Sequence, residues 1–312
     1  MDVPVEELRD RLGPDVEVVF AAGYGLGGDA DGADADGPGD EDARLRAEAV
    51  RVARAADRVV VFFGLPAAEE SEGFDRTHLD LPAGQLRLLA ALRESTDHPL
   101  TVVLSNGSAV RTSTWDGDAD AILESWLSGQ AAGGAVADLL TGRANPSGKL
   151  AETIPIRLED NSSFLNFPGD SGVVRYSEGV FVGYRGHDRS AQEVSYPFGH
   201  GLSYTTFDVG GLSVRTSGSV AGDDLAVEVS VTVRNTGPVA GAEVVQVYVR
   251  DPECSVDRPV RELKGFAKVA LEPGEGRTAT MTLDRRAFAY WSIRHHDWVV
   301  EAGDFEVAVG TS

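Results

Sequence analysis

The spacing of hydrophobic residues changes along this chain, and the change limits the possible folds more than any other feature. The first half alternates helix-like spacing with short, uninterrupted apolar runs. Roughly the last hundred residues instead alternate apolar and polar side chains with a period of two. A chain of 312 residues is also long enough for about two domains of ordinary size. The pattern therefore predicts two domains of different class.

The first half predicts a mostly parallel sheet with helices on its faces. Strands are expected at residues 16–20, 59–63, 100–104 and 121–123, and helices at 45–56, 82–92 and 130–140. The run at 59–63 is continuously apolar, as is typical of a strand that is covered on both faces. Strands that alternate with helices in this way indicate an α/β domain, which we expect to span residues 1–155.

The last part predicts an antiparallel β-sandwich. Strict alternation runs through residues 227–233, 245–249, 279–283 and 305–309. Turn sequences such as Asn235-Thr-Gly237 separate these runs. Residues 156–204 show neither period but are rich in aromatic side chains, so we expect a linker that packs across a surface. The sandwich is then expected at residues 205–312.

The acidic composition argues against two classes of partner. The chain has 28 Lys and Arg against 50 Asp and Glu, which gives a net charge of −22. Nucleic acids and anionic membranes would both be repelled by this charge. No apolar run is long enough to cross a bilayer, and the first residues do not form a secretory signal, so a cytoplasmic protein is expected. The single cysteine, Cys254, cannot form an internal disulfide and is expected to be partly buried and unreactive.

Several short motifs resemble ligand sites but lack the required context. The glycines at residues 23–28 fit a dinucleotide motif, but the aspartates that follow would repel a pyrophosphate and do not match the spacing of a calcium loop. Residues 142–149 are one residue too long for a phosphate loop. The adjacent His295 and His296 would point to opposite faces of a strand. We therefore expect no metal site and no cofactor.

One acidic loop, residues 67–76, has side chains suited to catalysis. It follows the run at 59–63, and open α/β sheets handle ligands in the loops beyond the carboxyl ends of their strands. Glu69, Glu70 and Glu72 would raise one another's pKa by like-charge repulsion, which is what a general acid needs. On the residues alone, a solvated acidic loop without a catalytic role is the alternative interpretation.

The order of several segments resembles the C-terminal region of glycoside hydrolase family 3. In the first half the resemblance is carried by residues 59–65 (VVVFFGL), 70–76 (ESEGFDR), 79–82 (LDLP) with Gln85, and 145–148 (NPSG). Farther along it is carried by residues 176–185 (YSEGVFVGYR), 196–204 (YPFGHGLSY), 247–250 (VYVR) and 262–266 (ELKGF). The resemblance implies an α/β sandwich domain with a mostly parallel sheet, followed by an all-β immunoglobulin/fibronectin III-like sandwich.

The resemblance also implies a β-glucosidase-type enzyme that retains the anomeric configuration. Glu72, directly before Gly73, matches the family's acid/base residue, with Glu70 and Glu69 as rivals. Asp75 and Arg76 are expected to support the loop. Retention needs a second carboxylate as nucleophile, which the family carries on an N-terminal TIM barrel of about 250 residues. No such barrel precedes the loop here, so no nucleophile is expected in this chain.

The expected partners are therefore a TIM-barrel domain or subunit and a β-linked glucoside or oligosaccharide. Alone, the chain is expected to be nearly inactive, whether it is a fragment, a split subunit or the product of a degenerate gene. The alternative function is a non-catalytic module that binds carbohydrate or protein. Outside the loop, Glu178 is expected to pack or form a salt bridge, His200 to lie in a turn, and Trp115 and Trp126 to belong to the core.

Overall fold

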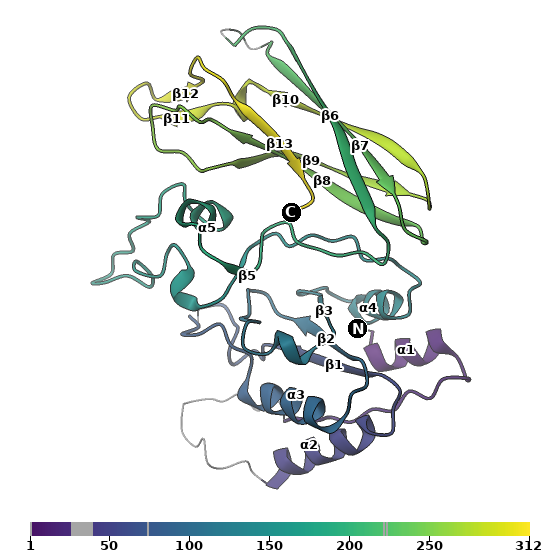
Figure 1. Cartoon of the computed structure of the whole chain (residues 1–312). Coiled ribbons are helices and arrows are strands. Elements are labelled where there is room, and N and C mark those ends of the chain that lie inside the picture. Colours follow the sequence, from purple (N-terminus) through teal and green to yellow (C-terminus); the bar gives the residue numbers. More distant parts are fainter. Residues whose placement is uncertain (1, 26–39, 74, 221, 223) are drawn as a thin grey trace. The chain divides into compact units, whose positions relative to one another are not determined.

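The computed structural model describes residues 2–25, 40–73, 75–220, 222 and 224–312. The chain separates into two compact units (Figure 1): Met1–Ala144 with Ile154–Leu158, and Asn145–Thr153 with Glu159–Ser312. The glycine motif at residues 23–28 and most of the aspartates after it extend outside the described residues. Among the helices that are described, none has the length and apolar character needed to cross a membrane.

A parallel sheet forms the centre of the first unit, as the alternating pattern predicts. Its strand order is β1 (Val59–Gly64), β2 (Leu100–Ser105) and β3 (Ala121–Glu124). Both strand pairs are parallel, with Val61 opposite Val102 and Val102 opposite Ile122. The carboxyl ends of all three strands therefore lie at one edge of the sheet.

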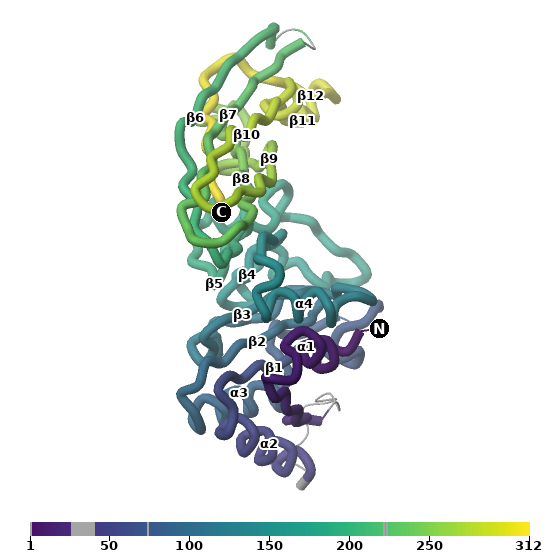
Figure 2. The backbone as a smooth tube through the Cα atoms, turned by 90° about the vertical axis from the view of Figure 1, so that its right-hand side faces the viewer, coloured from purple at the N-terminus to yellow at the C-terminus, as the bar shows by residue number. Residues whose placement is uncertain are grey.

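The helices of the first unit are α1 (Pro4–Leu12), α2 (Asp40–Ala53), α3 (Ala83–Ser95) and α4 (Ala132–Leu140). Figures 1 and 2 show α2 beside α3 and α1 beside α4. The buried core joins α2 and α3 to the sheet through Ala53, Leu89, Phe63, Val102 and Leu104. α3 begins directly after Pro82, because proline is well tolerated where a helix starts and its missing N–H is not needed.

The predicted strand at residues 16–20 is wrong. This segment forms no strand, and Val16, Val19 and Phe20 are 47%, 55% and 66% exposed. The side chain of Arg9 donates two hydrogen bonds to the carbonyl oxygen of Val18, at 3.3 and 3.1 Å. A short apolar run becomes a strand only where its backbone N–H and C=O groups form hydrogen bonds with a neighbouring strand. Here the Val18 carbonyl accepts hydrogen bonds from the Arg9 guanidinium instead.

Two antiparallel sheets form the sandwich of the second unit, as the period of two predicts. One has the order β10 (Gly276–Asp284), β7 (Ala226–Asn235), β6 (Phe207–Ser217), and the other β13 (Glu306–Gly310), β8 (Gly241–Arg250), β9 (Glu262–Leu271). Their inward side chains share one core, which includes Val229, Val231 and Val233 from β7 and Val245 and Val247 from β8. The fold class predicted from the sequence is therefore confirmed: an α/β domain followed by an all-β sandwich.

Shorter elements complete the two units. They are β4 (Ile154–Pro155), α5 (Tyr184–Ser190), β5 (Val194–Tyr196), the hairpin β11 (Tyr290–Ser292) and β12 (Asp297–Val299), and 3-10 helices at Asp116–Asp118, Leu158–Asp160 and Arg285–Ala287. α5 belongs to the second unit and is attached to its sheet through Tyr184. The Tyr184 hydroxyl accepts a hydrogen bond from the Leu263 N–H at 2.9 Å, and its ring stacks on Phe198 with centroids 4.7 Å apart.

Candidate active site

The acidic loop follows the end of β1, where hydrogen bonds hold the backbone of Gly64 in place. The side chain of Gln85 is almost fully buried, donates to the Gly64 carbonyl at 2.8 Å and accepts from the Gly64 N–H at 3.1 Å. A Cβ atom on Gly64 would lie 2.2 Å from the carbonyl oxygen of Ser105. The close approach of β1 to β2 therefore requires glycine, and Gln85 holds both backbone groups of that residue.

Glu70 attaches the acidic loop to the segment that follows β2. One carboxylate oxygen accepts a hydrogen bond from the Gly107 N–H at 2.6 Å, and the other accepts one from the Ser108 hydroxyl at 2.5 Å. Hydrogen bonds to an ionised carboxylate are short and stronger than neutral ones. Both oxygens of Glu70 are thus occupied in holding the loop, which leaves this carboxylate poorly suited to transferring a proton to a substrate.

Arg76 makes a second attachment to the same segment. Its Nη1 donates to the Ser108 hydroxyl at 3.0 Å and to the Ala109 carbonyl at 3.3 Å, while Nε and Nη2 are buried without an acceptor among the described residues. Burial lowers the pKa of Arg76, and the charges of Glu70 and Glu69 act in the opposite direction. The structure thus places Arg76 beside Glu70, on the shared partner Ser108.

Glu72 lies between these two attachments and is free. Its side chain is exposed and makes no hydrogen bond or ion pair with any residue that the structure describes. Asp75 is likewise exposed and unpaired within the described chain, whereas Glu69 is half-buried. Of the three glutamates that the sequence leaves as rivals, Glu72 is therefore the exposed one, while Glu70 and Arg76, on either side of it in the sequence, are hydrogen-bonded to the segment after β2.

Sequence reasoning missed the polar residues that follow β2 and end β3. Asn106 is fully buried, and its Nδ2 donates to the Ser108 carbonyl at 2.9 Å and to Glu124 Oε2 at 3.4 Å. Glu124 Oε1 in turn accepts from the Trp126 N–H at 2.9 Å. A signal was present, because these residues lie at the carboxyl ends of apolar runs, where open α/β sheets place their sites. Together with Glu70, they connect the loops after all three strands.

The other candidates from the sequence lie outside this network. Trp115 is buried and donates to the Arg111 carbonyl, as expected for a core residue. His200 lies in a turn, since its N–H donates to Pro197 and its carbonyl accepts from Leu150. Glu178 is half-buried and makes no salt bridge within the described residues, which agrees with packing, the first of its two expected roles.

One group of possible metal ligands occurs among the described residues, and its oxygens already have partners. It consists of Asp251, Cys254 and Glu301. Arg258 donates to Asp251 at 3.3 Å, and Ser255 donates to Glu301 through its N–H at 2.8 Å. Burial raises the pKa of the half-buried Cys254, which disfavours the thiolate that a metal would need. The residues therefore form a hydrogen-bonded cluster rather than a metal site.

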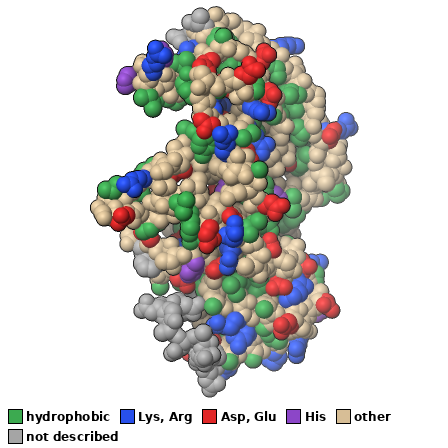
Figure 3. Space-filling model, turned by 60° about the vertical axis from the view of Figure 1, so that its left-hand side comes forward, with side chains coloured by type: hydrophobic (Ala, Val, Ile, Leu, Met, Phe, Trp, Pro, Cys, Tyr) green, Lys and Arg blue, Asp and Glu red, His purple; other side chains and the backbone are tan. Residues whose placement is uncertain are grey.

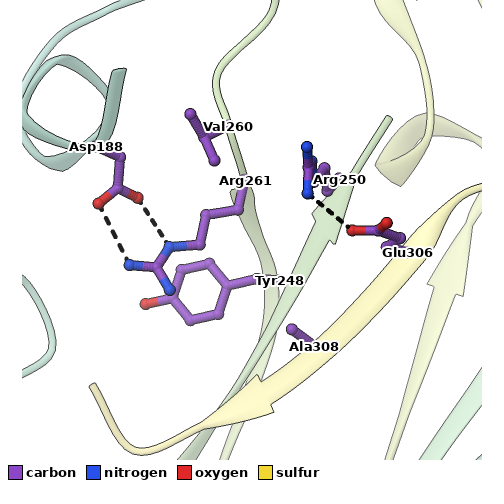
Figure 4. A pocket seen from close by; sticks show the side chains of 7 residues that line it. All are labelled: Asp188, Tyr248, Arg250, Val260, Arg261, Glu306 and Ala308. Carbon is purple, nitrogen blue, oxygen red and sulfur yellow. Dashed lines mark hydrogen bonds and ion pairs between the residues drawn. The ribbon is translucent and has the colours of Figure 1, made fainter. Parts of the chain in front are cut away.

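A cavity of about 270 Å³ is lined by residues of β8, of β13, of α5 and of the segment just before β9 (Figure 4). Its charged side chains pair with one another: Arg261 with Asp188 at 2.8 Å, and Arg250 with Glu306 at 3.2 Å. Tyr248 forms part of the wall, and burial raises its pKa to about 12. Because its charged side chains are already paired with one another, this cavity is a weaker candidate for the active site than the acidic loop.

The attachment through Glu70 can be tested directly. In Glu70→Gln, the neutral side chain should weaken the hydrogen bonds to Gly107 and Ser108, so the Gly107 amide should exchange about tenfold faster with solvent deuterium. Asp75→Asn is the matched control and should leave that exchange rate unchanged, because Asp75 is exposed and unpaired. Equal exchange rates in both variants would show that Glu70 does not hold the loop.

Comparison with known proteins gives one consistent result. Residues 1–204 match the glycosyl hydrolase family 3 C-terminal domain, and residues 243–312 match a fibronectin type III-like domain. The chain is 47% identical over 312 residues to thermostable beta-glucosidase B of Acetivibrio thermocellus, covering 100% of this chain and 40% of that protein. It is 49% identical over 271 residues to an exo-alpha-(1->6)-L-arabinopyranosidase of Bifidobacterium breve, covering 87% of this chain and 35% of that protein.

A solved structure agrees with these matches. The GH3 beta-glucosidase of Bifidobacterium adolescentis superimposes with a TM-score of 0.90 at 49% identity, covering 100% of this chain and 44% of that one. The chain thus spans less than half the length of the relatives that it matches.

Proposed function

This chain belongs to glycoside hydrolase family 3 as part of its C-terminal region, and on that premise we propose that it supplies the general acid/base for hydrolysis of β-glycosidic bonds. The observation that carries the proposal is the state of Glu72, a free carboxyl on a loop anchored through Glu70 and Arg76. A proton donor must reach its substrate unobstructed and from a fixed position. Asp75 is exposed and unpaired as well, and Glu72 is assigned the role because it stands directly before Gly73, at the position that matches the family's acid/base.

The mechanism follows from the two carboxylates that a retaining glycosidase needs. Glu72, protonated, gives its proton to the glycosidic oxygen as the bond between that oxygen and the anomeric carbon breaks. A second carboxylate attacks the anomeric carbon and forms a glycosyl–enzyme intermediate. The Glu72 carboxylate then removes a proton from the water that releases the sugar. The two carboxyl groups must lie about 5–5.5 Å apart, so the partner domain has to approach this loop closely.

We propose that the second carboxylate comes from a TIM-barrel domain or subunit, and that the substrate is a β-linked glucoside or a related oligosaccharide. The relatives support locating sugar specificity outside this region. A protein named as a β-glucosidase and one named as an arabinopyranosidase are about equally similar to this chain, at 47% and 49% identity. A region that selected the sugar would be expected to resemble one of them more than the other.

Reconstitution tests this function. The part of the Acetivibrio relative that precedes the matched region would be produced separately and mixed with this chain, and hydrolysis of an aryl β-glucoside followed. Activity is expected only in the mixture, because each part carries one of the two carboxylates. Size-exclusion chromatography shows whether the parts associate. Association without hydrolysis, or full hydrolysis by either part alone, would contradict the proposal.

A further inference from the structure

The Ser108 hydroxyl joins the two attachments of the acidic loop. It donates a hydrogen bond to Glu70 Oε1 at 2.5 Å and accepts one from Arg76 Nη1 at 3.0 Å. A hydroxyl has one proton to donate and lone pairs that accept, whereas an ionised carboxylate only accepts and a guanidinium only donates. The side chain of Ser108 can therefore bond to both charged groups at the same time.

Opposite charges are joined differently elsewhere in the first unit. Acidic and basic side chains lie close together on its surface (Figure 3), and Arg93, for example, bonds directly to Asp120 at 2.7 Å. Within the described part of the chain, Glu70 and Arg76 form no ion pair with each other, although the charge of Glu70 acts on the pKa of Arg76. The Ser108 hydroxyl between them is thus the contact that links the two ends of the loop.

The backbone of Ser108 is held from the interior of the first unit. Its carbonyl accepts a hydrogen bond at 2.9 Å from Nδ2 of Asn106, whose side chain is fully buried. The N–H of the preceding residue, Gly107, donates to Glu70 Oε2 at 2.6 Å. Ser108 itself is exposed, so its hydroxyl is presented on the surface from a fixed backbone. A group that is fixed in this way can hold a neighbouring loop in one place.

We propose that Ser108 positions Glu72 for proton transfer, an inference that rests on the acid/base role proposed above. In the sequence, Glu72 lies between Glu70 and Arg76. Because both flanking side chains bond to one hydroxyl, the segment between them is closed into a short loop, which restricts where the Glu72 backbone can lie. A misplacement of about 1 Å can slow a reaction about 100-fold. Ser108 is therefore a positioning residue, which acts on Glu72 only through Glu70 and Arg76.

Amide exchange in the chain alone measures the attachment. The N–H groups of Glu69 and Glu70 donate to the Pro66 carbonyl at 2.8 and 3.0 Å, so they exchange with solvent deuterium only when this turn opens. In Ser108→Ala, which removes the shared hydroxyl, both amides should exchange about tenfold faster. Ser108→Thr keeps a hydroxyl at this exposed position, and its exchange rates should stay within about twofold of those of the unsubstituted chain.

Activity of the reconstituted enzyme separates positioning from general damage to the structure. Ser108→Ala should lower kcat for an alkyl β-glucoside about 10- to 100-fold and leave KM within about twofold, because the proton donor is displaced while sugar binding is unchanged. With a strongly acidic phenol as leaving group, the burst of phenol that accompanies formation of the glycosyl–enzyme should be almost unchanged, since this step needs little protonation. General damage would lower the rates of both substrates alike. Ser108→Thr should restore turnover of the alkyl glucoside to within about threefold.

Ser113→Ala is the matched control. Ser113 is also exposed and its hydroxyl donates to the Ile156 carbonyl at 3.0 Å, but it bonds to no residue of the acidic loop that the structure describes. This variant should match the unsubstituted chain in both assays.

Three results would overturn the positioning role and leave the role of Glu72 intact. They are unchanged exchange and alkyl glucoside turnover in Ser108→Ala, equal losses in Ser108→Ala and Ser108→Thr, and equal losses with the two substrates. Full turnover of the alkyl glucoside by Glu72→Gln would instead overturn the proposed function, and the positioning role with it.

Discussion

Glu72→Gln is expected to lower the turnover of an alkyl β-glucoside by about 10²- to 10⁴-fold in the reconstituted enzyme, which is the range of general acid–base catalysis. The glutamine side chain keeps the shape of the glutamate but cannot donate a proton to the departing oxygen. A glucoside with a strongly acidic phenol as leaving group needs little protonation, so formation of its glycosyl–enzyme should be almost unchanged. Turnover of that substrate should then be limited by release of the sugar, which needs Glu72 as base.

Added azide provides a sharper measurement of the same role. Azide attacks without needing a base, so it should restore turnover of Glu72→Gln with the activated substrate and yield a glycosyl azide with the configuration of the substrate. Asp75→Asn, on the same loop and also exposed, should neither lose activity to this degree nor respond to azide.

The rival carboxylate is tested in the same assay. If Glu70→Gln showed the azide response and Glu72→Gln did not, the acid/base would have to be reassigned to Glu70. We expect the opposite, because both oxygens of Glu70 accept hydrogen bonds from Gly107 and Ser108. A loss in Glu70→Gln that arises only from movement of the loop would not be rescued by azide.

Gly64→Ala should destabilise the first unit by about 3 kcal/mol, at the upper end of the range for overpacking. The added Cβ would lie 2.2 Å from the Ser105 carbonyl oxygen, which is backbone and cannot turn aside. Strands β1 and β2 would have to separate, and both hydrogen bonds between Gln85 and Gly64 would lengthen. Urea denaturation, followed by the fluorescence of the buried Trp115 and by amide exchange in β1, measures the effect.

Gly210→Ala is the matched control. Gly210 also lies in a strand, and a Cβ placed there would have no atom within 4 Å. This variant should change stability by less than about 0.5 kcal/mol, as is usual for an exposed position. Equal destabilisation by the two substitutions would show that the contact between Gly64 and Ser105 is not the cause.

The local spacing of hydrophobic residues was sufficient to predict most helices and strands, because their buried side chains recur at regular intervals along the chain. The alternation at residues 227–233 becomes β7, whose valines all enter the core of the sandwich. The apolar run at 59–63 becomes β1, the first strand of the parallel sheet. The same rule was wrong at residues 16–20, where Arg9 donates to the Val18 carbonyl and no strand of the described chain pairs with the segment. Hydrophobic spacing is a property of one segment, whereas a β-strand also needs a neighbouring strand to form hydrogen bonds with its backbone.

The sequence by itself determined the class of each domain, the family, and the loop in which the acidic residues gather. It left Glu69, Glu70 and Glu72 as rivals, since like charges at neighbouring positions are equivalent until their surroundings are known. Only the tertiary structure gives them different surroundings. The parallel pairing of β1 with β2 brings Gly107 and Ser108, 37 and 38 residues farther along, to Glu70, while Glu72 stays exposed. Such contacts depend on distant parts of the chain meeting in space, which local spacing cannot specify.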